Sequence, residues 1–256
     1  MLDIEINEPK KIIRFAIIFN NLKNIFNETN MYFNENGLYL QAMDSSQICC
    51  CEFKLSKDWF CKYKIKKDVV IGINLEVFDK ILSCLDRKLR ISIKYQDNDK
   101  FSIQLKDDNI TKIYQVALID IDSSILEIPE VDYSADIYLK SMYFKNYINE
   151  LALFGDDMTI NCNEKNIVLK SSGNGNSSVI IIKDEYLEEY SVEEDIDLES
   201  TYNIQYLKNI TNFVKLKNEI YIGISNTYPL VIIYNLTDDK ENYIKFYVAP
   251  KIVEDD

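Results

Sequence analysis

The chain has 256 residues, of which 47% are hydrophobic, so it can bury a sizeable core and is not disordered as a whole. It contains no histidine, which excludes Ser-His-Asp, Cys-His and histidine-metal chemistry but leaves mechanisms based on carboxylates, lysine or tyrosine open. The net charge of −13 argues against a uniformly basic nucleic-acid binder, although one basic face is compatible with an acidic total.

Few glycines and prolines and many aromatic residues (6 Gly, 4 Pro, 18 Tyr and 12 Phe) favour a strand-rich globular protein. No apolar run approaches the ~20 residues that span a bilayer. The start, MLDIE, lacks the pattern of a signal peptide, so an intracellular protein is expected. The six cysteines show no Cys-x-x-Cys pair, and we expect reduced core residues and no metal site.

The first predicted element is an amphipathic helix, because four apolar residues advance by 4, 3 and 3 positions along one stripe. These residues are Phe15, Phe19, Leu22 and Ile25. The same stripe recurs 129 positions later, at Phe144, Ile148, Leu151 and Phe154. A repeat at one constant offset indicates an internal duplication.

Alternating apolar residues around an Asn-rich break then predict a hairpin, at Met31, Phe33, Leu38 and Leu40. Its repeat lies at the same offset, at Ile160, Cys162, Ile167 and Leu169. Residues 47–55 (QICCCEFKL) form a strand-like run. A second duplicated helix begins near Asn74 with Leu75, Phe78 and Ile81, and near Asn203 with Ile204, Leu207 and Ile210.

The remaining strands are predicted at residues 88–95, 101–106, 111–118, 179–183, 219–224, 230–235 and 244–248. We therefore predict an α+β fold of two similar domains, each with antiparallel sheets packed against two helices. The N-terminal domain is expected at residues 1–118 and the C-terminal domain at 134–256. Residues 119–133, acidic and ending IPEVDY, are expected to form an extended connector.

Three other segments have alternative readings. Residues 171–178 (SSGNGNSS) resemble a phosphate-binding loop but lack its Gly-Lys-Ser/Thr ending, so a hairpin turn is expected. Asp120, Asp122, Glu127 and Glu130 are carboxylates suited to a divalent metal, but an extended connector would scatter them. The acidic run at residues 185–199 is expected to be a surface loop.

Four local motifs resemble those of eukaryotic sliding clamps, in the same order along the chain. They are LQAMDSS at 40–46, GINL at 72–75 with KIL at 80–82, LIDID at 118–122 with IPE at 128–130, and APKI at 249–252. The chain is thus similar to the proliferating cell nuclear antigen (PCNA) family over essentially its whole length. The resemblance implies a non-enzymatic homotrimeric ring of six domains, without cofactors, whose helices line a central hole.

Such a ring would encircle double-stranded DNA without reading its sequence and act as a polymerase processivity factor in replication and repair. The implied partners are DNA polymerase, a clamp loader and other clamp-motif proteins; no membrane is implied. The implied location is the nucleus, or a viral replication site if a virus encodes the chain. Subunits would join by pairing edge strands through Thr111, Ile113, Tyr114 and Val116 of one chain and Ser178, Val179, Ile180, Ile181 and Ile182 of the next.

The resemblance also assigns two binding surfaces. Basic residues expected to meet DNA are Lys10, Lys11, Arg14, Lys23, Lys80, Lys145, Lys208 and Lys215. Ser83, Asn146 and Asn149 replace basic residues of relatives, so a less positive hole is expected. A pocket for partner peptides with one aliphatic and two aromatic anchors is expected from Met43, Gln47, Ile48, Cys50, Leu126, Ile128, Pro129, Pro229, Tyr247, Ala249, Pro250 and Ile252.

Two departures from the family concern regulation and partner choice: Gln47 replaces a usual histidine, and Glu164, beside Lys165, replaces the lysine that is modified in eukaryotic clamps. Three alternatives remain open at this point. They are a subunit of a checkpoint-type heterotrimeric clamp, a carboxylate-metal hydrolase or nuclease, and a structural β-rich assembly protein. The sequence does not identify its source or the polymerase and loader that it serves.

Overall fold

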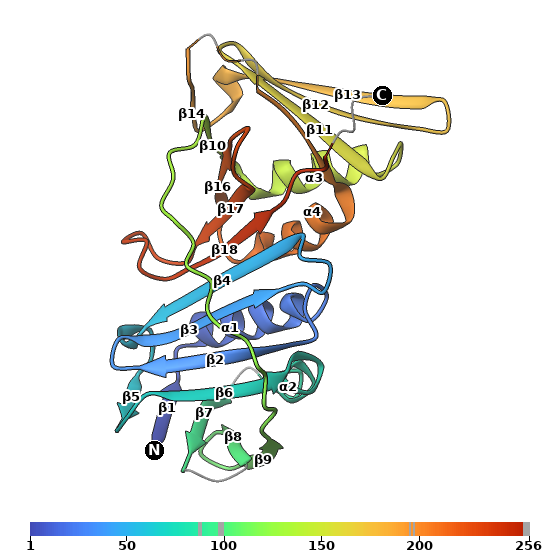
Figure 1. Cartoon of the computed structure of the whole chain (residues 1–256). Coiled ribbons are helices and arrows are strands. Elements are labelled where there is room, and N and C mark those ends of the chain that lie inside the picture. Colours follow the sequence, from blue (N-terminus) through green and yellow to red (C-terminus); the bar gives the residue numbers. More distant parts are fainter. Residues whose placement is uncertain (87–88, 97–99, 195, 197, 253–256) are drawn as a thin grey trace. The chain divides into compact units, whose positions relative to one another are not determined.

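The computed structural model describes residues 1–86, 89–96, 100–194, 196 and 198–252 (Figure 1). The chain divides into two compact units. Unit 1 contains Met1–Asp44, Cys51–Leu126 and Leu236–Ile244, and unit 2 contains Ser45–Cys50, Glu127–Asn235 and Lys245–Asp256.

The first half of the chain carries two antiparallel sheets and two helices. Its elements are β1 (Leu2–Ile6), α1 (Pro9–Leu22), β2 (Glu28–Asn34), β3 (Gly37–Met43), β4 (Cys49–Ser56), η1 (Lys57–Trp59), β5 (Lys62–Ile65), β6 (Val69–Asn74), α2 (Leu75–Leu82), β7 (Arg90–Tyr95), β8 (Lys100–Lys106) and β9 (Thr111–Ala117). The strand order is β5-β1-β7-β8-β9 in one sheet, and the other contains the run β4-β3-β2-β6, which is part of a larger sheet. Phe15 and Phe19 of α1 pack against Phe78 of α2, with ring centroids 6.3 and 4.5 Å apart.

The second half repeats this arrangement. Its elements are β10 (Ala135–Lys140), α3 (Ser141–Leu151), β11 (Asp157–Asn163), β12 (Asn166–Gly173), β13 (Asn176–Lys183), η2 (Asp184–Tyr186), β14 (Glu189–Val192), β15 (Leu198–Asn203), α4 (Ile204–Thr211), η3 (Asn212–Lys215), β16 (Glu219–Ile224), β17 (Leu230–Asn235) and β18 (Tyr243–Val248). The strand orders are β13-β12-β11-β15 and β14-β10-β16-β17-β18. The two halves have the same succession of elements apart from the extra turn η3, which confirms the predicted duplication.

The predicted hairpin is present in both halves. Phe33 lies opposite Leu38 in the first, and Cys162 lies opposite Ile167 in the second. The second helices also begin as predicted, because Asn74 Oδ1 accepts a hydrogen bond from the Val77 N–H at 3.0 Å. In the repeat, Asn203 Oδ1 accepts from the Gln205 N–H at 2.9 Å. An asparagine cap satisfies an amide that has no partner within its helix.

Some predictions about individual elements were wrong. The helical stripes end at Leu22 and Leu151, and Ile25 and Phe154 lie in the turns that follow. Each of these two residues donates its N–H to the carbonyl three residues back, at 3.0 Å. This is the tighter hydrogen bond of a 3₁₀ turn, and it ends the α-helix. The predicted strand at 88–95 begins at Arg90 in the structure; Lys88 lies outside the described residues.

The acidic segment 185–199 is not a loop, because it contains β14 and the start of β15. Pairing with β10 fixes β14 through its backbone, and the acidic residue of this strand, Glu189, is exposed. The segment 171–178 is a hairpin as predicted, and its turn is formed by Asn174 and Gly175 at φ of 52° and 80°. Cys61 and Cys84 are exposed rather than part of the core, whereas Cys49, Cys50, Cys51 and Cys162 are buried.

Candidate functional site

Among the predicted DNA-binding residues on the helices of unit 1 (the helix face), Lys23 makes the shortest ion pair. Its Nζ lies 2.5 Å from Oδ2 of Asp79, whose side chain is only 6% exposed. Asp79 Oδ1 accepts a second hydrogen bond from Asn20 Nδ2 at 3.0 Å. The pair joins the end of α1 to α2, so the charge of Lys23 is matched within the protein before any ligand arrives.

Most of the other predicted DNA-binding cations also have partners. Lys80 pairs with Glu76 at 2.7 Å, and both side chains are well exposed, so this pair is weak. Lys11 Nζ donates to the Trp59 carbonyl at 3.0 Å, and Arg14 donates to the Leu236 carbonyl at 3.0 Å. In unit 2, Lys145 donates to Asn212 Oδ1 at 3.0 Å.

Lys10 and Lys215 are exposed and Lys208 is half-buried, and within the described residues none of the three forms an ion pair. The helices also expose apolar side chains, at Ile13, Val77, Met142 and Tyr143. The helix face therefore offers fewer uncommitted cations than the count of lysines and arginines predicts.

The C-terminal tail lies against segment 45–50 and β15 within unit 2. Ala249 N donates to the Ile48 carbonyl at 2.9 Å, and Lys251 N donates to the Thr201 carbonyl at 2.7 Å. Lys251 Nζ also reaches Asp157 Oδ2 at 2.6 Å. Beyond this anchor the side chain of Ile252 is 91% exposed, so the tail presents an apolar group to solvent.

The structure thus brings together Ile48 and Ala249, two of the residues predicted for the peptide pocket. Cys50 is buried, and Tyr247 and Ile128 are half-buried, while Gln47, Pro129, Pro229 and Pro250 are exposed. Gln47 has a φ of 57°, which turns the chain sharply before β4. Met43 and Leu126 belong to unit 1, where their side chains are 42% and 46% exposed.

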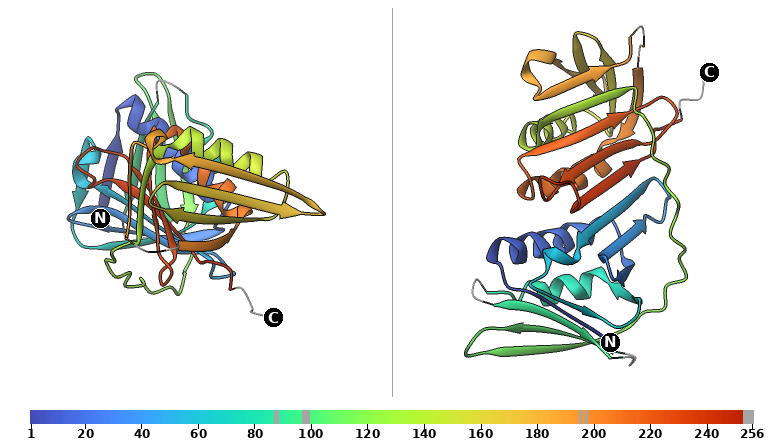
Figure 2. Two further views of the ribbon diagram at one scale, coloured as in Figure 1. Left: turned by 90° about the horizontal axis from the view of Figure 1, so that it is seen from above. Right: turned by 90° about the vertical axis from the view of Figure 1, so that its left-hand side faces the viewer.

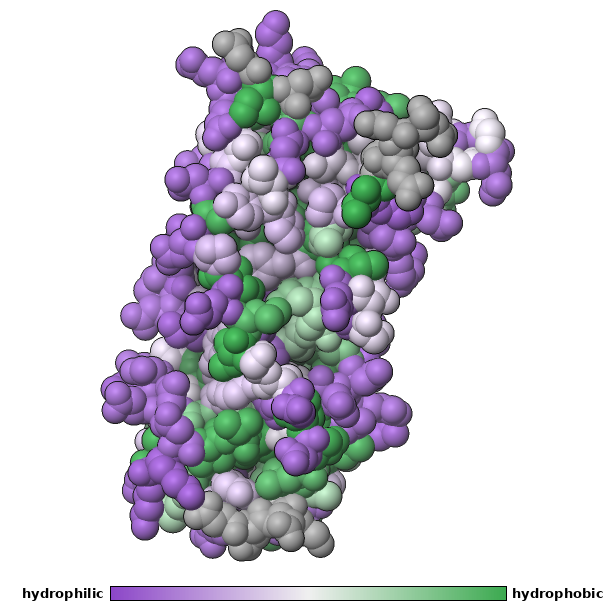
Figure 3. All heavy atoms as spheres, in the orientation of Figure 1, coloured by the Kyte–Doolittle hydropathy of each residue, from purple (hydrophilic) through white to green (hydrophobic). Residues whose placement is uncertain are grey.

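The connector is the extended segment between β9 and β10, drawn in green in Figure 1. It contains no helix or strand, as predicted. Hydrophobic side chains interrupt the hydrophilic covering of the face that Figure 3 shows. Ile125 of the connector, which the sequence analysis did not select, is 46% exposed.

Two long strands lie at sheet edges, and both were predicted as subunit contacts. β9 is the outer strand of the five-stranded sheet of unit 1, and β13 is the outer strand of the four-stranded sheet of unit 2 (Figure 2). Both expose apolar side chains, at Ile113 (58%), Val179 (55%) and Ile181 (64%). By contrast, the edges β6 and β15 each accept a hydrogen bond from an irregular segment, through Gly72 and Thr201.

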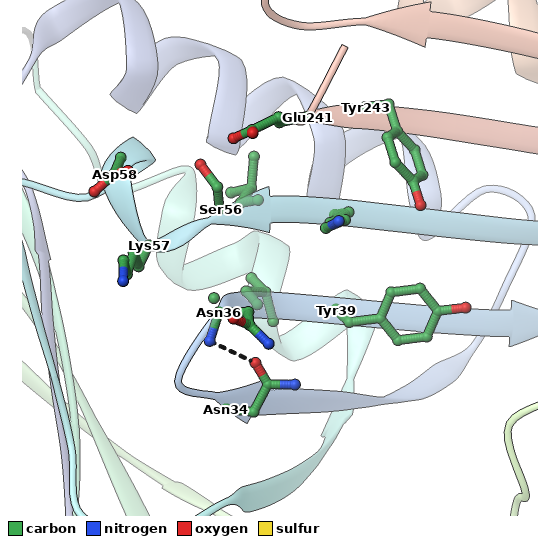
Figure 4. Close-up of a pocket in the computed structure, with 12 residues that line it drawn as sticks. Asn34, Asn36, Tyr39, Ser56, Lys57, Asp58, Glu241 and Tyr243 are labelled. Carbon is green, nitrogen blue, oxygen red and sulfur yellow. Dashed lines mark hydrogen bonds between the residues drawn. The ribbon is translucent and has the colours of Figure 1, made fainter. Parts of the chain in front are cut away.

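Unit 1 also has an open cavity of about 610 Å³ on β3 and β4, which contains none of the predicted site residues. Figure 4 shows its polar lining, with Tyr39 and Tyr243 at one end and Lys57 and Asp58 at the other. Burial raises the pKa of Tyr243 to about 12, so its hydroxyl stays protonated near neutral pH.

Among the residues that the structure describes, no group of three or more Asp, Glu, Cys or His side chains is placed to hold a metal ion. No helix in this part of the chain is long and apolar enough to cross a bilayer.

Sequence reasoning missed several residues that organise these surfaces, including Asn30, Gln41, Asp79 and Tyr133. Each acts on a segment far along the chain; the hydrogen bond from Gln41 to Leu126, for example, spans 85 residues. No spacing in the sequence marks such contacts. The local signal for Gln41 was its polar amide within β3, whose other residues are Gly, Leu, Tyr, Ala and Met.

Comparison with known proteins agrees with the duplicated architecture. The family model "Proliferating cell nuclear antigen, N-terminal domain" matches residues 1–125, and the model of the C-terminal domain matches residues 127–251. The proliferating cell nuclear antigen of Chaetomium thermophilum is 29% identical over 225 residues, which are 85% of this chain and 86% of that protein. The chain therefore belongs to the proliferating cell nuclear antigen family, and it is a sliding clamp of the kind that serves as a DNA polymerase processivity factor.

Proposed function

We propose that three copies of this chain form a closed ring around duplex DNA, joined by β9 of one subunit and β13 of the next. The observation that carries the proposal is the pair of long edge strands with exposed apolar residues, one in each unit. Among the described residues, no strand pairs with the outer side of either one, and a seven- and an eight-residue strand offer a matching length. A head-to-tail contact of this kind forms a ring when its rotation closes, which removes both edges.

The mass of the protein in solution tests the ring, and a particle of three chains is expected. Ile181→Lys places a charge in the proposed contact and should shift the mass toward a single chain. Leu153→Lys is a matched control, because Leu153 is exposed but lies outside both edge strands. A native protein that remains a single chain at all concentrations would contradict the homotrimer; assembly only with other chains would indicate a heterotrimeric clamp.

Inside the ring, α1, α2, α3 and α4 would face the DNA and meet phosphates without reading bases. The helix-face cations support this role, and their many internal partners favour loose contacts that allow sliding. The proposal assigns no catalytic residue. Opening the ring onto DNA would need a separate clamp loader, and the expected location is the nucleus or a viral replication site.

Partner proteins would bind through the residues of the predicted peptide pocket. Support comes from unit 2, where the tail lies against segment 45–50 and leaves Ile252 exposed. An apolar anchor inserted among such side chains concentrates binding energy in a few contacts. DNA polymerases and other proteins with a clamp-binding motif are the proposed occupants.

A further inference from the structure

The first half of the connector is fastened to unit 1 by hydrogen bonds between segments that lie far apart in the sequence. Ile119 N donates to the Gly72 carbonyl at 3.2 Å, at the outer edge of β6. A Cβ on Gly72 would lie 2.0 Å from the Ile119 oxygen, so only glycine lets the connector approach this strand. Asn30 Nδ2 then donates to the Ile121 carbonyl at 3.0 Å and to Ser123 Oγ at 3.1 Å.

Gln41 makes the last of these attachments, at Leu126. Its Oε1 accepts from the Leu126 N–H at 2.7 Å, and its Nε2 donates to the Leu126 carbonyl at 3.0 Å. One side-chain amide thereby satisfies both backbone groups of Leu126, as a neighbouring strand would. No other side chain bonds Leu126 in the described part of the chain.

The orientation of the Gln41 amide is set by a second chain of hydrogen bonds. Gln41 Nε2 also donates to the Tyr39 hydroxyl at 3.2 Å, and that hydroxyl donates to Glu52 Oε1 at 2.7 Å. A flipped amide would turn its oxygen toward the Leu126 carbonyl and lose both bonds to Leu126. Burial and the hydrogen bond to Glu52 raise the pKa of Tyr39, so this network keeps its protons near neutral pH.

The far end of the connector is held separately, within unit 2. The ring of Tyr133 occupies the space above Gly223, where an added Cβ would lie 2.6 Å from Tyr133 Cγ. Tyr221 stands edge-on to Tyr133 with ring centroids 6.4 Å apart, and its hydroxyl donates to Asp136 Oδ1 at 2.5 Å. The residues between the two attachments, 127–132, include Ile128 and Pro129 of the proposed pocket.

We propose that Gln41 is a positioning residue that holds the connector at Leu126, so that Ile128 and Pro129 are presented to a partner peptide in ordered form. This inference rests on the proposed function of the pocket. A segment that is ordered before binding does not lose that conformational freedom when the partner binds. Releasing the connector reduces the fraction of molecules that are ready to bind the peptide. The apparent affinity falls in proportion to that fraction.

Gln41→Met keeps the length of the side chain and removes both bonds to Leu126. Two net hydrogen bonds at the lower end of their usual strength, as expected for exposed groups, correspond to about a tenfold change in the equilibrium constant between the attached and the released connector. We expect backbone amide exchange of residues 119–126 to be about tenfold faster in the full-length variant without peptide. Binding of a synthetic peptide with a glutamine, one aliphatic and two aromatic anchors should weaken by up to about tenfold, the limit reached when the released connector is the major form.

Gln205→Met is the matched control, because it changes an exposed glutamine on α4 that contacts Asn209 instead of the connector. Tyr39→Phe removes the hydroxyl that orients the Gln41 amide and should produce a smaller change in the same direction. A Tm close to that of the native protein would show that each variant is folded.

Unchanged amide exchange in Gln41→Met would overturn the proposal, and so would faster exchange with unchanged peptide affinity. If the native protein fails to bind the peptide, the pocket itself is wrong. The exchange measurement contains no peptide and still decides whether Gln41 holds the connector. The two failures are therefore distinguishable.

Discussion

Replacing Asp79 by asparagine tests how the charge of the helix face is set. Asp79 holds Lys23 at 2.5 Å and is itself nearly buried, so its negative charge cancels a cation that the sequence assigns to DNA. Asparagine has nearly the same shape and keeps an oxygen that can accept from Asn20. In Asp79→Asn the ammonium group of Lys23, already 30% exposed, is expected to become available to phosphate.

The size of the effect follows from counterion release. Each added phosphate contact steepens the slope of log K against log salt by about 0.9 on B-DNA. One new contact therefore makes affinity fall about 3.5-fold further between 50 and 200 mM salt. Three copies in the proposed ring set an upper limit of about 2.7 on the change in slope. The lost charge-assisted hydrogen bond costs the fold about 1.5–3 kcal/mol, toward the lower value because Lys23 is partly exposed.

The assay is a salt titration of the full-length protein on a duplex of fixed length, with the Tm measured in parallel. Asp79→Asn should bind more tightly than native at low salt and show the steeper slope. The matched double variant, with Lys23→Met added, should return to the behaviour of Lys23→Met alone. Equal slopes for native and Asp79→Asn, or a double variant as steep as Asp79→Asn, would refute the reasoning.

Four further predictions follow from the same contacts. Ile128→Ala should remove most of the affinity for the synthetic clamp-binding peptide, whereas Ile125→Ala, an exposed connector residue outside the pocket set, should keep it; equal losses would point to another site. Gly223→Ala should displace Tyr133 and lower the Tm, and a native Tm with an unchanged Tyr133 environment would contradict the packing. Charge reversal of Lys23 and Lys80 together should weaken retention on DNA, and unchanged processivity would discredit their assignment. A thiol reagent should label Cys61 and Cys84 in the native protein, because these two side chains are exposed and the other four cysteines are buried. All six should be labelled after denaturation. Burial raises the pKa of Cys162 to about 12, so rapid labelling of Cys162 in the native protein would be inconsistent with the structure.

The sequence by itself determined the repeated parts of this protein. A helix buries one stripe and a strand buries one side, so the periodicities at Phe15, Phe19 and Leu22 and at Phe33 and Leu38 report burial directly. Asn74 likewise marks a helix start, because capping is a local interaction. The free edges β9 and β13 were named through resemblance to a family, and the structure shows that both are outermost strands.

Only the tertiary structure decided how these parts are connected. Lys23 meets Asp79, 56 positions away, because α1 and α2 pack together, and this contact gives a predicted DNA-binding residue an ion-pair partner within the protein. Gln41 meets Leu126, 85 positions away, because the connector lies along unit 1. Periodicity tells which way a side chain faces along its own element. It does not tell which distant residue will share that space, and that partner decides whether a charge or an amide remains free for a ligand.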